Sequence, residues 1–410
     1  MKLFNSDFIN FKRVKGALFM TFWLIIVTFP IMVLKINTVD DTVLWRWWNL
    51  MIIGVLGFFG TYVWNYSLDR MNAKKGIKNP LSVKISGLWN NLVTKPKVKY
   101  SSIAVAALVV IVFPVIAPMY NTSIMTTALI YVVLGLGLNI IIGLGGLLHL
   151  GYAAFFAVGA YTYGLLYQYL HVNFWIALPL GGISALIIGL LVGLPVLRLR
   201  GDYLAIVTLA FGEILRIVLN NLGDLTGGPD GISRIPRPGI IGLHLKLPGA
   251  INLTYYIMVL LVVITIVVVR RIEDSRIGRA LEAMREDEVA AESMGIDIMK
   301  TKLTAFALGS MWAGFAGVVM AAKTTKVTPD SFGLMESVIV LCIVVLGGMG
   351  SIPGILLGAF VFKIVMEYFR VFAMYRMLIF GAVLVIMMVF KPGGLIPKIR
   401  KKYTIETEGE

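Results

Sequence analysis

Residues 250–269 read AINLTYYIMVLLVVITIVVV, a run of 20 residues without a charged side chain. About 20 apolar residues in a helix cross a hydrocarbon core of roughly 30 Å. Similar runs recur along the chain, in which 58% of the 410 residues are hydrophobic and 14% are charged. A soluble domain has about 25% charged residues. The sequence therefore predicts an all-α polytopic membrane protein, because continuously apolar runs are typical of membrane-spanning helices.

Twelve apolar segments are predicted to be transmembrane helices, two in an N-terminal extension and ten in a core. The Gly-rich sequence GGMGSIPG at 347–354 leaves open whether 335–368 forms two full spans or shorter re-entrant segments. The twelve segments are 17–34, 43–66, 101–119, 123–143, 147–168, 174–197, 203–221, 250–269, 303–322, 335–350, 354–368 and 374–390.

The basic residues predict the orientation of these spans. Eight Lys and Arg residues lie in 67–100 and seven in 270–302, two segments that share one side of the membrane. Cytoplasmic loops carry an excess of Lys and Arg, so both termini are predicted to be cytoplasmic. The net charge of +15 is then explained by topology and lipid headgroups, and no nucleic-acid partner is expected. The predicted units are a two-span extension over 1–100, a ten-span core over 101–397 and a tail over 398–410.

Motifs for catalysis are missing from the sequence. Cys342 is the only cysteine and the three histidines are far apart, so neither a disulfide nor a metal site is expected. No nucleophile–base spacing suggests an enzyme. The chain has no G-x-x-x-x-G-K-[ST] motif for nucleotide phosphates. If ATP drives its activity, separate ATPase subunits must hold Mg-ATP, and no cofactor is expected in this chain.

Two spans carry small residues at every fourth position, which places them on one face of a helix. Such residues let helix backbones approach closely in lipid. They predict helix packing, with the wall of a translocation path as an alternative. The first set is Gly181, Ala185, Gly189 and Gly193, and the second is Ala305, Gly309, Ala313, Gly317 and Ala321.

Ionisable residues also occur within predicted spans. Glu213 and Arg216 are three residues apart, and Lys363 and Glu367 are four apart. A charge at the bilayer centre costs at least about 2.5 kcal/mol unless it is paired or hydrated. These spacings allow pairing along one helix face. A structural ion pair is therefore expected, and a polar path is the alternative for Glu213.

A charged segment follows the run at 250–269. Residues 275–294 are predicted to form one helix, with Ser275 as its N-cap and Gly295 just after its last turn. The helix combines a charged face with a broken apolar stripe at Ile277, Leu281, Met284, Ala291 and Met294. This combination suits docking onto a soluble partner. A solvated loop helix is the alternative.

Six blocks of the sequence together resemble the M-type (LivM-like) permease subunit of branched-chain amino acid ABC importers. The likeness runs from about residue 101 to residue 397, and the two-span extension resembles one carried by some M-type subunits. The blocks are LGLGLNIIIGLGGLLHLGYAAFFAVGAY (134–161), PVLRLRGDYLAIVTLAFGEILRIVLNN (195–221), LTGGPDGIS (225–233), GRALEAMREDEVAAESMGI (278–296), KLTAFALGSMWAGFAGVV (302–319) and VVLGGMGSIPG (344–354).

The resemblance implies a set of partners in a bacterial cytoplasmic (inner) membrane. They are a paralogous permease, two cytoplasmic ATPase subunits and an extracytoplasmic protein that delivers leucine, isoleucine or valine. The segment 279–295 matches the family's ATPase-coupling helix, although DIMKTKL replaces the I-x-L-P that ends the usual signature. The resemblance implies coupling residues at Arg279, Glu282, Arg285, Glu286, Asp287, Glu288, Glu292 and Gly295.

A path for aliphatic amino acids needs small and apolar walls with a few polar groups for the zwitterion. The candidates are Gly151, Tyr152, Tyr161, Asp202, Tyr203 and Glu213. For the tyrosines the alternative is an interfacial anchor, and for Asp202 it is a cap on a helix that begins at Tyr203. Three other functions remain open: an ion-driven secondary transporter, a permease for a nucleoside, urea or short amide, and a membrane scaffold.

Overall fold

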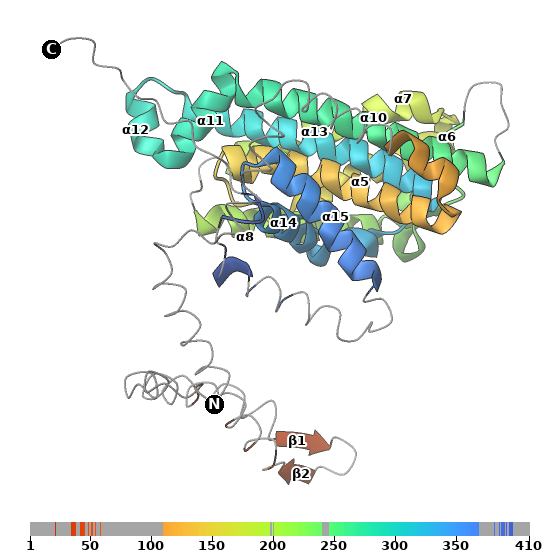
Figure 1. The fold of residues 1–410 in the computed structure, drawn as a ribbon, viewed down its shortest axis with the longest axis horizontal. Coiled ribbons are helices and arrows are strands. Elements are labelled where there is room, and N and C mark those ends of the chain that lie inside the picture. Colours follow the sequence, from red (N-terminus) through yellow and green to blue (C-terminus); the bar gives the residue numbers. More distant parts are fainter. Residues whose placement is uncertain are drawn as a thin grey trace, which may run out of the picture. The chain divides into compact units, whose positions relative to one another are not determined.

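The computed structural model describes residues 110–368 except 197, 198, 200 and 240–245, the segments 34–37 and 42–45, and isolated residues elsewhere (Figure 1). The chain divides into two compact units, Met1–Val105 and Ala106–Glu410. The tail at 398–410, most of the predicted spans at 17–34, 43–66 and 374–390, and the first half of the span at 101–119 lie outside the described residues. The number of twelve spans and the cytoplasmic position of both termini therefore stay predictions.

The first unit contains a β-hairpin where the sequence predicts only helices. Strands β1 (Leu34–Asn37) and β2 (Thr42–Trp45) are antiparallel, with Leu34 opposite Trp45 and Asn37 opposite Thr42. β2 occupies the start of the span predicted over 43–66, so that boundary was wrong. The β-branched residues Ile36, Thr42 and Val43 favour extended backbone. A search for apolar runs about 20 residues long does not detect strands of four residues.

Eight long helices of the second unit agree with eight of the predicted spans, within a few residues at most ends. Five of them are long and apolar enough to cross a membrane, counting the π- and 3₁₀-turns joined to them. The helices are α5 (Met119–Asn139), α6 (Tyr152–Leu170), α7 (Phe174–Val196), α8 (Asp202–Asn221), α10 (Leu247–Glu273), α13 (Ile298–Thr324), α14 (Leu334–Gly347) and α15 (Ile352–Tyr368).

The connection from α5 to α6 is longer than predicted. α5 continues as a π-helix, η2 (Ile140–Leu144), in which the Gly145 N–H donates to the Ile140 carbonyl at 3.2 Å. The span predicted to begin at 147 begins at Tyr152, because Gly146, with φ +69°, takes a conformation that ends the helix. The polypeptide is therefore not α-helical between the two spans over 140–151.

Residues 335–368 form two short helices that meet at glycines. α14 has 14 residues, or 19 with the 3₁₀ turn that precedes it, and α15 has 17, so both lie at the lower end of the roughly 17–25 residues of a full span. A Cβ added to Gly347 would lie 2.6 Å from the Gly354 carbonyl oxygen, so the two backbones touch at this joint. Glycine makes this sharp reversal possible.

Helix α13 lies at the centre of the bundle and contacts α5, α6 and α7 (Figure 1). Trp312 and Phe306 of α13 are buried together with Tyr152 and Phe155 of α6. α5 and α13 are buried along most of their length, as expected for helices that are apolar on all sides.

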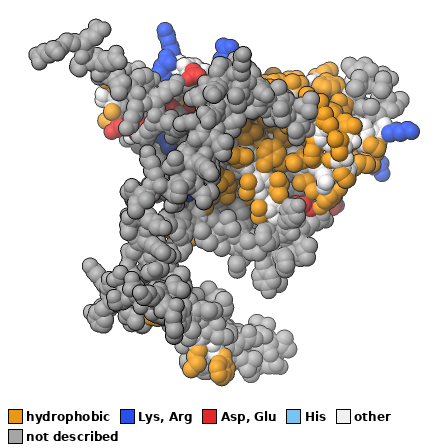
Figure 2. All heavy atoms as spheres, in the orientation of Figure 1, with side chains coloured by type: hydrophobic (Ala, Val, Ile, Leu, Met, Phe, Trp, Pro, Cys, Tyr) orange, Lys and Arg blue, Asp and Glu red, His pale blue; other side chains and the backbone are white. Residues whose placement is uncertain are grey.

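The outer helices present apolar side chains on their exposed faces. On α7 these side chains recur every three or four residues, so they form one stripe: Ile176, Leu180, Ile183, Ile187, Leu191 and Leu194. Figure 2 shows a wide hydrophobic surface with Lys and Arg gathered toward its two ends. A surface of this kind is suited to lipid, in which exposed apolar side chains carry no penalty.

The two sets of small residues lie at helix–helix contacts. On α7, Gly181 faces Val318, Gly189 faces Ser310 and Gly193 faces Leu303, all on α13. On α13, Gly309 faces Ile141 of η2, and a Cβ on Gly317 would lie 2.7 Å from the Ala160 nitrogen of α6. The alanines of both sets, Ala185, Ala305, Ala313 and Ala321, are fully buried.

Loops that the sequence places on one side of the membrane meet at one end of the bundle. Strand β3 (Ile232–Ser233) pairs with β4 (Lys326–Val327), and the Trp175 indole donates to the Gly239 carbonyl at 2.9 Å. The 222–249 loop also contains α9 (Gly223–Thr226) and η3 (Gly228–Asp230), and η4 (Pro329–Phe332) precedes α14. The opposite end carries the charged segment at 275–295.

Candidate functional site

The charged segment forms two helices and not the single helix predicted over 275–294. α11 (Arg276–Glu286) and α12 (Glu288–Ser293) are separated by Asp287, which has φ −158° and ψ 114°. The Asp287 carboxylate accepts hydrogen bonds from the Val289 and Ala290 N–H groups at 2.8 and 3.0 Å. Asp287 is therefore an N-cap that begins a second helix, which is why the one-helix prediction was wrong.

The ends of the segment agree with the sequence. The Ser275 hydroxyl accepts from the Gly278 N–H at 3.2 Å and caps α11, and Gly295 takes φ +81° after α12. The apolar stripe is divided: Leu281, Met284 and Ala291 are buried, while Ile277 and Met294 are exposed. Figure 1 shows α11 and α12 beyond one end of the helix bundle.

Two of the eight predicted coupling residues point back into the bundle. The Arg285 guanidinium donates to the Gly143 carbonyl of η2. The Glu288 carboxylate pairs with the Lys302 ammonium of α13 at 2.7 Å, and the Lys302 side chain is only 2% exposed. These contacts tie α11 to η2 and α12 to α13.

The remaining charged coupling candidates lie on the outer side of the helix pair. Arg279, Glu286 and Glu292 are exposed, and Glu282 is half-buried. Two large apolar side chains accompany them, Val289 and Met294, the latter 83% exposed. The sequence did not single out Val289, because apolar residues at helical spacing more often belong to a core.

Two path candidates, Gly151 and Tyr152, lie at closely packed positions. A Cβ on Gly151 would overlap the Thr208 carbonyl of α8, and the Leu150 N–H donates to the Thr208 hydroxyl at 3.2 Å. Tyr152 is fully buried, and its hydroxyl donates to the Gly309 carbonyl at 2.8 Å. Tyr152 therefore links α6 to α13.

Glu213 and Tyr161 lie around the turn η4. The Glu213 carboxylate pairs with Arg216 at 2.9 Å, as its spacing predicts, and accepts from the Leu334 N–H at 3.2 Å. Arg216 also pairs with Asp330 of η4 at 3.1 Å. The Tyr161 ring lies edge-to-face with Phe332 of η4 at a centroid separation of 6.3 Å. Glu213 thus joins α8 to the first residue of α14.

Asp202 and Tyr203 begin α8 and are exposed. As the alternative to a path role, the sequence offers Asp202 as the cap of a helix that begins at Tyr203. In the structure Asp202 is itself the first residue of α8 and Gly201, with φ +57°, precedes it, so this alternative is not borne out. Tyr203 is 72% exposed. The structure does not bring these two residues together with Tyr152, which is fully buried.

A polar face of α5 was missed in the sequence. Tyr120, Thr127 and Tyr131 are spaced at seven and four residues, so they lie on one side of the helix. Their partners lie on three other helices: Glu367 of α15 accepts from Tyr120, Lys323 of α13 donates to Thr127, and Glu336 of α14 accepts from Tyr131. The Lys363 ammonium lies 3.5 Å from the centre of the Tyr131 ring.

A bundle of long apolar helices around a packed centre, with a charged helix pair held at one end, is typical of a multi-pass membrane protein. The family model for the branched-chain amino acid transport system permease component matches residues 120–388. The chain belongs to this family of permease components.

Named relatives cover most of the chain. It is 41% identical over 397 residues to the high-affinity branched-chain amino acid transport system permease protein LivM of Escherichia coli, covering 91% of this chain and 90% of that protein. The LivM protein of Salmonella typhimurium is 43% identical over 76% of this chain and 78% of its own length. The LivH permease of Escherichia coli is 23% identical over 66% of this chain and 93% of its own length. No solved structure matches.

Proposed function

We propose that this chain is the membrane-spanning permease subunit of an ATP-driven importer that moves leucine, isoleucine and valine into the cytoplasm. The family and the names of the LivM relatives support the class of solute. One structural observation carries the ATP-driven mechanism: α11 and α12 lie outside the bundle and are tied to its interior by the Glu288–Lys302 pair. ATP hydrolysis takes place on separate subunits that bind this helix pair.

The proposed assembly contains a second, related permease, two cytoplasmic ATPases and an extracytoplasmic binding protein. The likeness of this chain to both LivM and LivH proteins supports a pair of related permeases. The assembly lies in the bacterial cytoplasmic membrane, with α11 and α12 in the cytoplasm. Because the binding protein carries the amino acid, the permease needs only to alternate between two states with different affinities for it.

The test is uptake by the complex purified with its partners and reconstituted in liposomes. Labelled leucine is expected to accumulate only with ATP and binding protein, and unlabelled isoleucine and valine are expected to compete. Uptake that follows an ion gradient without ATP would show a secondary transporter. Competition by urea or a nucleoside, but not by valine, would show a different solute.

Met294→Asp is expected to lower ATP-dependent uptake at least about tenfold while the protein inserts normally. Met294 is 83% exposed on the outer side of the helix pair, so the change places a charge in the proposed contact with the ATPase. Loss of one apolar anchor at an interface costs about 2 kcal/mol. Uptake and co-purification of the ATPase are measured together. Met299→Asp, at an exposed methionine on the first turn of α13, is the matched control; an equal loss in both variants would contradict the docking role of Met294.

Glu213→Gln separates a path residue from a structural ion pair. If Glu213 lines the path, as we propose, uptake falls at least about tenfold while insertion and thermal stability stay close to those of the parent protein. A half-exposed ion pair contributes only about 0–1 kcal/mol, so its loss alone leaves uptake nearly unchanged. Normal uptake by Glu213→Gln removes Glu213 from the path.

A further inference from the structure

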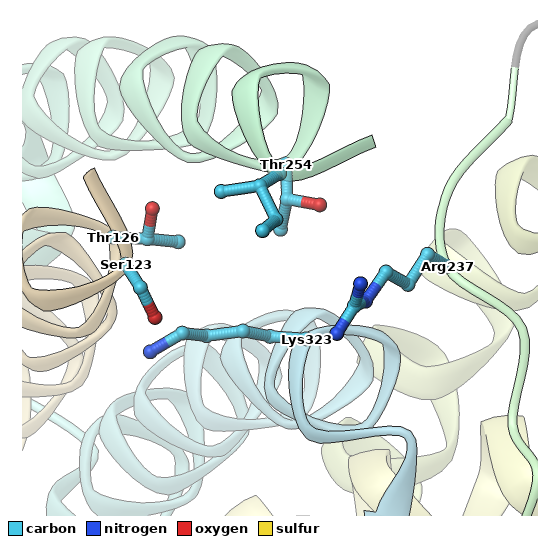
Figure 3. Close-up of a pocket in the computed structure, with 6 residues that line it drawn as sticks. Ser123, Thr126, Arg237, Thr254 and Lys323 are labelled. Carbon is cyan, nitrogen blue, oxygen red and sulfur yellow. The ribbon is translucent and has the colours of Figure 1, made fainter. Parts of the chain in front are cut away.

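A small polar cavity opens at the end of the bundle where β3 and β4 lie. Three helices line it: Ser123 and Thr126 come from α5, Ile251 and Thr254 from α10, and Lys323 from α13, with Arg237 entering from the loop after β3 (Figure 3). Its volume for water-sized groups is about 50 Å³. About 10–15 Å³ on that measure holds one water, so the cavity has room for a group of several heavy atoms.

Among the residues that the structure describes, the cavity is lined by two cations and by no carboxylate. Figure 3 shows Lys323 reaching toward Ser123, with the Arg237 guanidinium facing the same space from the opposite side. Both side chains are half-buried, and within the described residues neither forms an ion pair. Lys323 donates one hydrogen bond, to Thr127, and an ammonium has three donors. Most of the donors of both cations are therefore available to a ligand.

The neighbouring acidic groups are engaged elsewhere. Glu336 accepts from Tyr131 and Glu367 accepts from Tyr120, and neither residue lines the cavity. The hydroxyl groups of the two cavity threonines donate hydrogen bonds within their own helices. Thr126 donates to the Thr122 carbonyl at 2.8 Å, and Thr254 donates to the Ala250 carbonyl at 2.7 Å. Positive charge therefore dominates the cavity, and the Ser123 hydroxyl is placed to add a further donor.

We propose that this cavity is an anion site that takes one oxyanion group from the extracytoplasmic side. Two cations held out of bulk water without a counter-charge are unfavourable, and an entering anion removes that cost. The planar guanidinium of Arg237 matches the two oxygens of a carboxylate or a phosphate, and Lys323 supplies a point charge beside it. A free carboxylate, such as that of an amino acid, and a lipid phosphate share this chemistry. The amino acid source rests on the proposed function, and the lipid source does not.

The experiment measures how fast a water-soluble acylating reagent labels Lys323 in the purified full-length complex. Mass spectrometry follows Lys323 together with Lys326, an exposed lysine in β4 that serves as the internal control. Ionic strength is held constant with chloride. Acetate, leucine and leucinamide are the free probes, and nanodiscs of phosphatidylglycerol or phosphatidylcholine are the lipid probes. An oxyanion in the cavity is expected to slow labelling of Lys323 at least threefold and to leave Lys326 unchanged.

Arg237→Gln is expected to raise the anion concentration needed for this protection at least tenfold, and Arg237→Lys is expected to retain most of the protection. Protection by acetate and leucine but not by leucinamide assigns the site to a free carboxylate. Protection in phosphatidylglycerol discs without any free probe assigns it to a lipid phosphate. Equal protection in phosphatidylcholine discs shows that the phosphate suffices, and protection in phosphatidylglycerol alone shows that the lipid must carry a net negative charge. Labelling of Lys323 that no probe alters, or protection that is unchanged in Arg237→Gln, overturns the proposal. If ATP-dependent uptake of leucine fails while Lys323 is still protected, the proposed function falls and the anion site stands.

Discussion

Gly314→Ala is expected to remove nearly all folded protein from the membrane. Gly314 of α13 touches the backbone of α7, and an added Cβ would overlap the Gly181 carbonyl and lie 2.6 Å from the Ala185 Cβ. On α6, a Cβ on Gly159 would meet the Gly314 backbone at 2.6 Å, so three helices converge here. A flexible side chain can change rotamer to avoid an added methyl group, but backbone atoms cannot. The added Cβ must therefore push α13 away from α7. We expect a loss of about 3 kcal/mol or more in stability.

Gly223→Ala is the matched control for this change. Gly223 begins α9, has an ordinary backbone conformation and has no atom within 4 Å of an added Cβ. Size-exclusion chromatography of a fluorescent fusion and thermal unfolding in detergent measure both variants. A parent-like yield and melting temperature in Gly314→Ala would mean that the helices are less closely packed than the structure has them.

Lys302→Met is expected to destabilise the protein by about 3 kcal/mol and to uncouple ATP hydrolysis from uptake. Lys302 is 2% exposed and Glu288 is 24% exposed, so the variant leaves a largely buried carboxylate without the ammonium of its salt bridge. Breaking a fully buried pair costs about 3–5 kcal/mol, and the partial exposure of Glu288 places this pair at the lower end. Uncoupling follows because Lys302 is the ion-pair anchor of α12 on α13. Unfolding in detergent and the ratio of ATP hydrolysed to leucine imported are the two measurements.

A neighbouring ion pair supplies the control for Lys302→Met. Lys300 pairs with Asp297 at 3.0 Å two residues earlier, but the two side chains are 84% and 49% exposed. Lys300→Met is therefore expected to change stability by less than about 1 kcal/mol. The double variant Glu288→Gln with Lys302→Met is expected to recover part of the loss, since it leaves no unpaired charge. Equal effects of Lys300→Met and Lys302→Met would refute a special role for the buried pair.

Long helices were the part of the fold best predicted from sequence. The run predicted over 174–197 is α7 at Phe174–Val196, because lipid demands about 20 apolar residues without interruption and such a run is visible in the chain alone. The breaks were less visible. The π-turn at 140–144 lies within a continuous apolar run, in which no residue marks the change of helix type. Next to it, the Asn139 side chain accepts from the Gly350 N–H at 2.8 Å, a contact with another element that spacing cannot reveal.

Most features of the charged segment at 275–295 could be predicted from neighbouring residues, but its division into two helices was not. Its position between two spans, its Ser275 cap and its final Gly295 could be predicted, since each depends on a few neighbouring residues. The break at Asp287 also has a local signal, because aspartate is a common N-cap and its carboxylate accepts from the Val289 and Ala290 N–H groups. The continuous helical pattern around it concealed this signal.

The inward contacts of Arg285 and Glu288 had no such signal. Their partners, Gly143 and Lys302, come from other elements, and pairing across elements cannot be inferred from spacing. The pairing of Glu213 with Arg216 was predictable because both residues lie on one helix, three positions apart.

The glycines shared by α6, α7 and α13 also restrict how the protein can move. Sliding one helix over another ordinarily requires side chains that exchange rotamers and fill the space that opens, but at Gly159, Gly181 and Gly314 the main chains abut directly. We therefore expect these three helices to move together as one unit. We also expect the widening that admits a solute to come from shear or hinge motion of helices outside this trio.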